Sequence, residues 1–310
     1  MTLFKHTRLT SSTIGHLCAL GSFLIWGVFP LYWKMLATVS PLEIICHRII
    51  WSTFVLAPIL LFRHLIFKPL WWKLFLDRKN FIYLSIGTIC IALNWLLYIW
   101  AVNNNHLLQS SMGYFINPLL NVLIGLIVFK EKLRKLQWIS VLLALLGVLN
   151  LTLMLGQFPW VALSIALTFA IYGALKKIQH INSLYGLTFE VCLLFIPASS
   201  YLLFIYQKNS LAFLHLTLLS DFLLVGSGLI TVIPLLLFGM AAQKLSLTTV
   251  GFLQYISPTM QFLIAVLIFK EKFTNTHLLT FILIWLALII YTLDGFISKK
   301  PVKKNLKKQT

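Results

Sequence analysis

Two polar stripes inside strongly apolar segments are the part of this chain best suited to bind a ligand. In the first, polar residues recur every three or four positions and therefore share one face of a helix: Ser110, Tyr114, Asn117 and Asn121. Shifting the last three by 140 positions leads to a second stripe on one helix face: Gln254, Ser257 and Gln261. Because polar groups within membrane-spanning segments are costly, these side chains are candidates for substrate binding.

Each stripe contains a proline, Pro118 in the first and Pro258 in the second. A proline lacks the N–H that would bond the carbonyl four residues earlier, which frees the carbonyls of Tyr114 and Gln254. One interpretation is that the prolines kink two helices and the amides join neighbouring helices, an interaction worth about 1 kcal/mol or less in lipid. Because matching prolines and polar faces occur twice, we favour a shared binding cavity between the two segments.

A further polar pair, Asn94 and Tyr98, is spaced i, i+4 in the apolar stretch NWLLYIWAVN. The same shift takes this pair to Pro234 and Phe238, so we expect the cavity to be polar on one side and apolar on the other. Four tryptophans are candidates to line it: Trp26, Trp33, Trp95 and Trp100. For Trp33 and Trp100 we favour a place in the interfacial aromatic belt.

Ionisable residues inside apolar segments are candidates for proton or ion coupling or for gating: Lys34, Glu43, His47, Arg48 and Glu190. Helical spacing places His47 on the face of Glu43 and turns Arg48 away by about 100°. A Lys34–Glu43–His47 network at one mouth of the cavity is therefore feasible. Glu43 also has a structural interpretation, because Ser40-Pro41-Leu42-Glu43 matches a helix capping box.

Glu190 lies roughly 10 Å inside its predicted helix, so it needs a cationic partner or a proton there. We interpret Glu190 or His47 as a residue that takes up a proton during transport. A purely structural ion pair is the alternative, and uptake that is insensitive to the proton gradient would exclude the first interpretation.

The elements that position these residues are membrane-spanning helices. The 310-residue chain is 60% hydrophobic and only 10% charged, against about 25% charged in a soluble domain. Its net charge of +18 does not indicate nucleic-acid binding, because almost no soluble surface exists to carry a basic patch. Segments of about 20 apolar residues predict ten spans: 14–36, 42–62, 81–102, 107–129, 135–155, 158–175, 184–206, 219–242, 248–269 and 276–297.

The two stripes belong to an internal repeat. The stretch GYFINPLLNVLIGLIVFKEK (113–132) returns as LQYISPTMQFLIAVLIFKEK (253–272). Lysine and arginine in short loops are retained in the cytoplasm, and with both termini cytoplasmic only Lys208, Lys270 and Lys272 fall outside. Because five spans separate equivalent points, the two copies are inverted across the membrane.

We therefore predict an all-α polytopic membrane protein with ten transmembrane helices in two inverted five-helix repeats. The expected divisions are a cytoplasmic segment 1–13, the repeats 14–155 and 158–297, and a basic cytoplasmic tail 298–310. Inverted repeats around a midplane site are typical of secondary transporters, an inference by analogy of fold. A non-transporting sensor or scaffold and a membrane-embedded enzyme are the alternatives, although we find no catalytic triad, carboxylate pair or nucleotide-binding loop.

No cofactor or metal is expected, because the four cysteines, Cys18, Cys46, Cys90 and Cys192, are isolated from one another and no histidines cluster. The expected partners are a small-molecule substrate and the lipid bilayer, with anionic lipid at the lysine-rich tail. No nucleic-acid partner is expected, and the sequence leaves a homodimer open.

Several segments resemble the RarD proteins of the EamA branch of the drug/metabolite transporter superfamily: GVFPLYWK (27–34), NWLLYIWAVNN (94–104), GYFINPLLNVLIG (113–125), LTFE (187–190), PLLLFGMAAQKL (234–245) and GFLQYISPTMQFL (251–263). The resemblance implies a ten-helix bundle of two inverted halves in the bacterial inner membrane. Related EamA proteins move amino acids, nucleotide-like metabolites and drugs, so the resemblance does not choose a substrate. Lys130 and Lys270 depart from the family pattern, which affects topology more than substrate.

Overall fold

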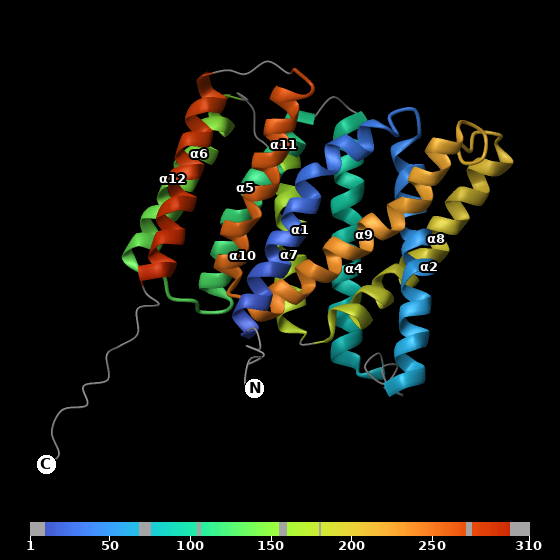
Figure 1. Cartoon of the computed structure of the whole chain (residues 1–310), viewed down its shortest axis with the longest axis horizontal. Coiled ribbons are helices and arrows are strands. Elements are labelled where there is room, and N and C mark those ends of the chain that lie inside the picture. Colours follow the sequence, from blue (N-terminus) through green and yellow to red (C-terminus); the bar gives the residue numbers. More distant parts are fainter. Residues whose placement is uncertain are drawn as a thin grey trace, which may run out of the picture.

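The computed structural model describes residues 10–67, 76–103, 107–154, 160–179, 181–270 and 275–297, and every regular element in these ranges is an α-helix (Figure 1). The helices follow in chain order: α1 (Ser11–Lys34), α2 (Pro41–Phe67), α4 (Arg78–Asn103), α5 (Leu107–Ile127), α6 (Lys135–Met154), α7 (Trp160–Ile178), α8 (Ser183–Gln207), α9 (Leu218–Lys244), α10 (Leu247–Gln254), α11 (Ile256–Leu267) and α12 (Asn275–Ile297). Lys272 and the basic tail 298–310 lie outside the described residues.

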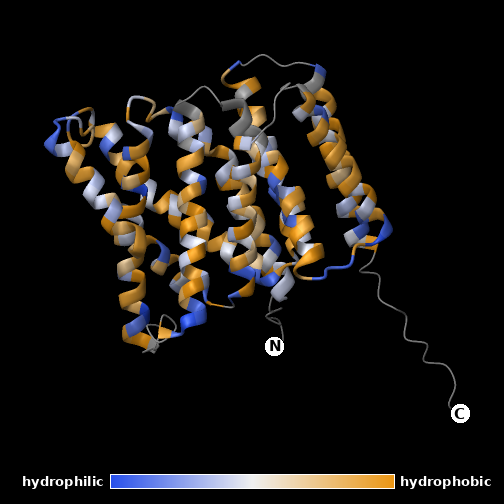
Figure 2. Ribbon diagram, turned by 180° about the vertical axis from the view of Figure 1, so that it is seen from behind, coloured by the Kyte–Doolittle hydropathy of each residue, from blue (hydrophilic) through white to orange (hydrophobic). Residues whose placement is uncertain are grey.

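The described helices are those of a membrane protein. Seven helical segments are long and apolar enough to cross a membrane, and two shorter apolar helices, Gly113–Ile127 and Lys135–Asn150, accompany them. Large apolar side chains such as Leu61 and Phe62 lie on the outside, and Figure 2 shows hydrophobic residues along the helices with hydrophilic ones mainly at their ends. A helix satisfies its own backbone hydrogen bonds, which a chain surrounded by lipid requires.

The directions of the helices can be followed in Figure 1. Helix α1 begins and α12 ends at the same end of the bundle, called the lower end here, and the opposite end is the upper end. Helix α5 runs from the upper to the lower end, whereas α10 and α11 run from the lower to the upper end. Helices α6 and α12 pack against each other at one side, away from α2, α8 and α9. The two copies of the repeated stretch therefore run in opposite directions.

Both copies end in the same backbone conformation. The N–H groups of Phe129 and Phe269 each donate to the carbonyl five residues earlier. The next residues, Lys130 and Lys270, have φ angles of 51° and 57°. A left-handed residue after the last turn is a common helix C-cap, usually filled by glycine. The similarity between the copies thus extends from their sequences to their local structure.

The copies differ at their prolines. Helix α5 passes Pro118 without interruption, whereas the second copy divides into α10 and α11 at Tyr255, three residues before Pro258. The hydrogen bond that Pro258 cannot donate to the Gln254 carbonyl explains a break at this place. Helices α10 and α5 approach closely just before the second copy, because a Cβ atom on Gly251 would lie only 2.7 Å from the Pro118 carbonyl oxygen.

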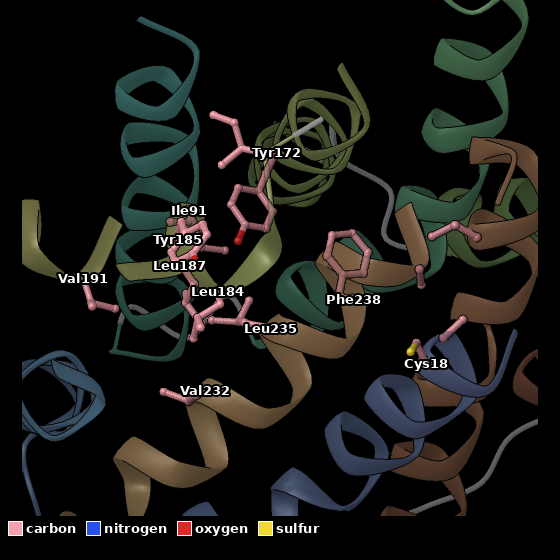
Figure 3. Packing of buried hydrophobic residues seen from close by; sticks show 14 of the residues in the cluster. Cys18, Ile91, Tyr172, Leu184, Tyr185, Leu187, Val191, Val232, Leu235 and Phe238 are labelled. Carbon is pink, nitrogen blue, oxygen red and sulfur yellow. The ribbon is translucent and has the colours of Figure 1, made fainter. Parts of the chain in front are cut away.

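Buried apolar clusters fix the helices that carry the polar residues. One cluster joins α1, α4, α7, α8 and α9, and in it the rings of Tyr172 and Phe238 lie nearly parallel with centroids 6.1 Å apart (Figure 3). Another cluster joins α5, α6, α10 and α12, with Phe252 stacked on Tyr291 at 3.9 Å. These two clusters hold the positions of α5, α7, α9 and α10, around which the candidate site is built.

Candidate functional site

The polar stripe of α5 is buried and joined to neighbouring helices. The Nδ2 atom of Asn117 donates to the Ala166 carbonyl of α7 (2.6 Å), and Nδ2 of Asn121 donates to Oε1 of Gln254 in α10 (2.9 Å). The amide side chains are at most 4% exposed. The structure therefore brings Asn117, Asn121 and Gln254 together, in an arrangement that links α5 to both α7 and α10. The side chain of Ser110 lies outside the described residues.

The remaining predicted amides also bind backbone carbonyls of helices distant in the sequence. The Nε2 atom of Gln261 donates to the Trp26 carbonyl of α1 (3.0 Å) and to Oγ of Ser257 (3.3 Å). Asn94 of α4 donates to the Ile165 carbonyl of α7 (2.8 Å). In lipid each such bond is worth about 1 kcal/mol or less, so together they position α1, α4, α7 and α11 with a modest gain in stability.

The last two predicted binding residues, Tyr98 and Tyr114, lie beside Arg48. Their ring centroids are 6.0 Å apart, and both side chains lie near the guanidinium. The Cζ atom of Arg48 lies 4.7 Å from the ring centroid of Trp95 and 5.1 Å from that of Trp33. These five side chains, the Arg48 cluster, come from α1, α2, α4 and α5, and all of them are only partly buried.

Sequence reasoning did not identify this cluster as a unit. The ring of Trp33 lies over Arg48, whereas Trp100 is 39% exposed and lies against Trp160, and the interfacial belt stays a prediction for both. The Nε atom of Arg48 also donates to Oγ1 of the buried Thr231 in α9 (2.9 Å). Thr231 gave no signal, because a threonine in an apolar helix is ordinarily expected only to bond the preceding turn.

At the upper end Glu43 connects the two halves of the chain. Its Oε1 atom accepts hydrogen bonds from the backbone N–H groups of Ala212 (2.9 Å) and Phe213 (3.1 Å), between α8 and α9. The Nε2 atom of His47 lies 3.9 Å from the same oxygen. Lys34 lies instead over the ring of Phe269, 5.2 Å from its centroid, and within the described residues it forms no ion pair with Glu43.

At the lower end Glu131 makes the corresponding connection. Its two carboxylate oxygens accept hydrogen bonds from the backbone N–H groups of Leu247 (2.7 Å) and Thr248 (3.0 Å). These groups belong to the first turn of α10, where a negative charge is favoured by the helix dipole. The sequence showed Glu131 only as part of the repeated Lys-Glu-Lys and gave no sign of this contact.

Glu190 of α8 has a cationic partner. Its Oε1 atom lies 2.7 Å from Nζ of Lys176, and its Oε2 atom accepts a hydrogen bond from the Tyr172 hydroxyl (3.1 Å). Both partners lie four residues apart on α7 and so share one face. The sequence pattern indicates Lys176 only as a basic residue at the cytoplasmic end of a span, although its side chain is 4% exposed. Proton uptake by Glu190 or His47 stays a prediction.

A further ion pair closes the lower end of α6 and α12. Arg134, just before α6, donates from Nε to Oδ2 of Asp294 (2.7 Å) and also from Nη2. This hydrogen bonding raises the pKa of Arg134 above its ordinary value. In the described part of the chain no group of three or more His, Cys, Asp or Glu residues is arranged to hold a metal ion.

Comparison with known proteins identifies relatives along nearly the whole chain. Residues 13–153 match the EamA-like transporter family. An uncharacterized transporter of Pseudomonas aeruginosa is 41% identical, covering 92% of this chain and 95% of that protein. The uncharacterized transporter YojE of Bacillus subtilis is 42% identical, with the same two coverages. Protein RarD of Escherichia coli is 37% identical over 94% of this chain and 97% of its own length.

A solved structure shares the fold. A crystal structure that is 16% identical to this chain superimposes on it with a TM-score of 0.67, covering 94% of this chain and 100% of the other. At this level of identity the likeness concerns the arrangement of the helices alone.

Proposed function

This chain belongs to the RarD group of EamA-like transporters, and we propose that it moves small metabolites or drugs across the bacterial inner membrane by alternating access. The observation that carries the mechanism is that the two copies of the repeated stretch run in opposite directions (Figure 1) and are joined directly by the hydrogen bond from Asn121 to Gln254. Inverted repeats that rock against each other around a fixed site are a common architecture of secondary transporters.

We further propose ten spans in two inverted halves, residues 14–155 and 158–297, with α10 and α11 forming one interrupted span. Transporters use such interrupted helices near the middle of the membrane to present free backbone groups to a substrate. The lower end is cytoplasmic in this proposal, because the loops there carry most of the basic residues, whereas Lys208 and Lys270 lie at the upper end.

In the proposed cycle the two halves are joined by one contact at each end of the protein, and one of these contacts breaks while the other is kept. Glu43 closes the external end through its bonds to Ala212 and Phe213, and Glu131 closes the cytoplasmic end through its bonds to α10. A hydrogen bond to a charged group contributes about 1.5–3 kcal/mol, which thermal motion and substrate binding can overcome. The Asn121–Gln254 bond lies where α5 and α10 cross and serves as the pivot.

The substrate binds on the partly exposed side chains near this pivot in our proposal. Tyr98 and Tyr114 retain accessible surface, whereas Asn94, Asn117 and Asn121 are buried against protein partners. We therefore assign the tyrosines to substrate contact and the asparagines to holding the halves in register.

Flux in proteoliposomes tests this function with a mixture of candidate substrates. Vesicles with the purified protein are loaded with the small-molecule fraction of a bacterial extract, and the compounds that leave are measured by mass spectrometry. We expect particular compounds to leave unchanged and faster than from protein-free vesicles. In protein whose natural cysteines are replaced, a bifunctional thiol cross-linker between Thr38→Cys and Ser210→Cys, across the external contact, should stop this efflux. A scaffold or sensor would release nothing selectively, an enzyme would release altered compounds, and either outcome would refute the proposal.

A further inference from the structure

The surroundings of Arg48 indicate the chemical class of the substrate. Arg48 lies seven residues after the start of α2, roughly 10 Å into the helix, which places it well inside the predicted span. A charged side chain at this depth is costly unless an anion or strong hydrogen-bond acceptors compensate it. The groups that surround the Arg48 guanidinium therefore indicate what it binds.

No carboxylate in the described part of the chain pairs with Arg48. Each acidic residue in the described ranges contacts other groups: Glu43, Asp77, Glu131, Glu190, Asp221 and Asp294. The Arg48 guanidinium instead donates from Nε to the neutral hydroxyl of Thr231 at 2.9 Å. A guanidinium has five N–H donors in a planar fork that fits the two oxygens of a carboxylate or phosphate.

Aromatic rings surround the guanidinium where an acidic partner would be expected. Trp95 and Trp33 present their faces to Cζ at 4.7 and 5.1 Å, and Tyr98 and Tyr114 lie near the guanidinium and against each other. Cation–π contacts stabilise the charge in part and leave the edge of the fork able to bind an anion. The rings also provide flat apolar surfaces on which another planar group can stack.

Thr231 fixes the orientation of the fork. Its own hydroxyl donates to the Ser227 carbonyl one turn earlier (2.8 Å), so its oxygen presents a lone pair to Nε of Arg48. Because α9 belongs to the second half and α2 to the first, this bond also makes the position of the guanidinium depend on the relation between the halves. A ligand on Arg48 would therefore be held at the boundary that moves during alternating access.

We propose that the Arg48 cluster binds the anionic group of a small aromatic or planar substrate, with Arg48 holding a carboxylate or phosphate and the four aromatic side chains holding the ring. This inference rests on the proposed transport function and names the substrate class for the same site. Positively charged and neutral compounds of the same shape are excluded as preferred substrates, since neither can fill the fork of donors.

Binding of four small probes to the purified protein in a non-ionic detergent tests the inference. Benzoate and phenyl phosphate carry the two anionic groups, whereas benzamide and benzylamine are neutral and cationic compounds of similar size. We expect millimolar or tighter binding of one or both anions, measured by quenching of tryptophan fluorescence and by thermal stabilisation. The comparison between benzoate and phenyl phosphate decides whether the site takes a carboxylate or a phosphate. Equal binding of benzamide, or binding of none of the probes, would overturn the inference.

Substitutions locate the anion on Arg48. Arg48→Gln removes the charge and Arg48→Lys keeps it without the fork, and both should weaken the binding of the preferred anion by about 10- to 100-fold. Arg63→Gln is the matched control, because Arg63 is also on α2 and lies over an aromatic ring, that of Tyr185. The affinity of the Arg63→Gln variant for the preferred anion should stay within twofold of wild type. If Arg48→Gln does not yield folded protein, Arg48→Lys carries the test, and unchanged anion affinity in that variant would overturn the inference.

Transport and anion binding at Arg48 can be refuted independently of each other. Efflux of unchanged compounds that are neutral, at equal rates in wild type and Arg48→Gln, would refute the anion site and leave the transport function standing. Anion binding that depends on Arg48 without any efflux would refute transport and leave the site standing.

Discussion

Replacing Glu190 by glutamine tests whether the buried pair in α7 and α8 is ionised. The Lys176 and Glu190 side chains are 4% and 2% exposed and their charged atoms lie 2.7 Å apart. Removing one partner of such a pair leaves the other charge buried alone, which costs about 3–5 kcal/mol. If Glu190 carried a proton instead, glutamine would be nearly isosteric and the cost would stay below about 1 kcal/mol.

The measurement is the free energy of unfolding by SDS titration in mixed micelles at neutral pH, followed by circular dichroism. We expect Glu190→Gln and Lys176→Met each to lower this free energy by about 3–5 kcal/mol. The double variant should lose far less than the sum, because no buried charge remains. Lys208→Met, at an exposed lysine, is the control and should change it by less than about 1 kcal/mol.

Additive losses in the double variant would refute the reasoning, since two residues that do not interact contribute independently. A small effect of Glu190→Gln alone would show that Glu190 is protonated in the resting protein. Glu190 would then hold a proton that it could release and take up again during transport, as the sequence predicts for Glu190 or His47.

Two further predictions concern packing and a surface ion pair. Gly228→Ala should lower the free energy of unfolding by about 1–3 kcal/mol, because the added Cβ would lie 2.4 Å from the backbone carbon of Trp51. The control is Gly295→Ala, which has open space around it and should be neutral or raise the free energy of unfolding by up to about 1 kcal/mol. Equal effects of the two substitutions in SDS titration would contradict the close contact between α2 and α9. Asp294→Asn should lower the free energy of unfolding by about 1 kcal/mol in the same titration, since its partner Arg134 is half exposed. The pKa of Arg134 is raised, so its charge is lost only above the ordinary arginine pKa, and the ion pair should contribute equally at neutral and moderately alkaline pH. Loss of this contribution over that pH range would contradict an ion pair between Arg134 and Asp294.

Local patterns in the sequence predicted much of what the structure contains. Apolar length and helical spacing located the helices and placed Asn117 and Asn121 on one face. The 140-residue shift paired the stripes of α5 and α10, and the structure joins Asn121 to Gln254 directly. These features depend on short-range periodicity and on duplication, both of which are visible in one sequence.

Contacts between distant segments were not predictable in the same way. Glu131 binds the first turn of α10 more than a hundred residues away, and Arg48 finds Thr231 on a helix of the other half. Which helices pack together decides these partners, and periodicity does not determine packing order. The break at Tyr255 is a further example, because Pro118 at the equivalent place leaves α5 continuous.

In the proposed cycle the Glu43 and Glu131 contacts close opposite ends of one alternating structure. Removing either carboxylate should therefore shift the same equilibrium in opposite directions. A loss of about 1–2 kcal/mol at one end corresponds to a roughly 5- to 30-fold change in the populations of the two states. The variants Glu43→Gln and Glu131→Gln apply these two perturbations without requiring a known substrate.

Electron–electron distance measurement between spin labels in lipid nanodiscs, after replacement of the natural cysteines, detects such a shift at each end of the protein. One pair of exposed sites, Thr38 and Ser210, reports the external end, and another, Lys132 and Lys244, reports the cytoplasmic end. We predict that Glu43→Gln lengthens the Thr38–Ser210 distance and shortens or leaves short the Lys132–Lys244 distance, and that Glu131→Gln does the reverse. Distances that lengthen together at both ends in either variant, or that change in neither, would contradict alternating access by these two halves.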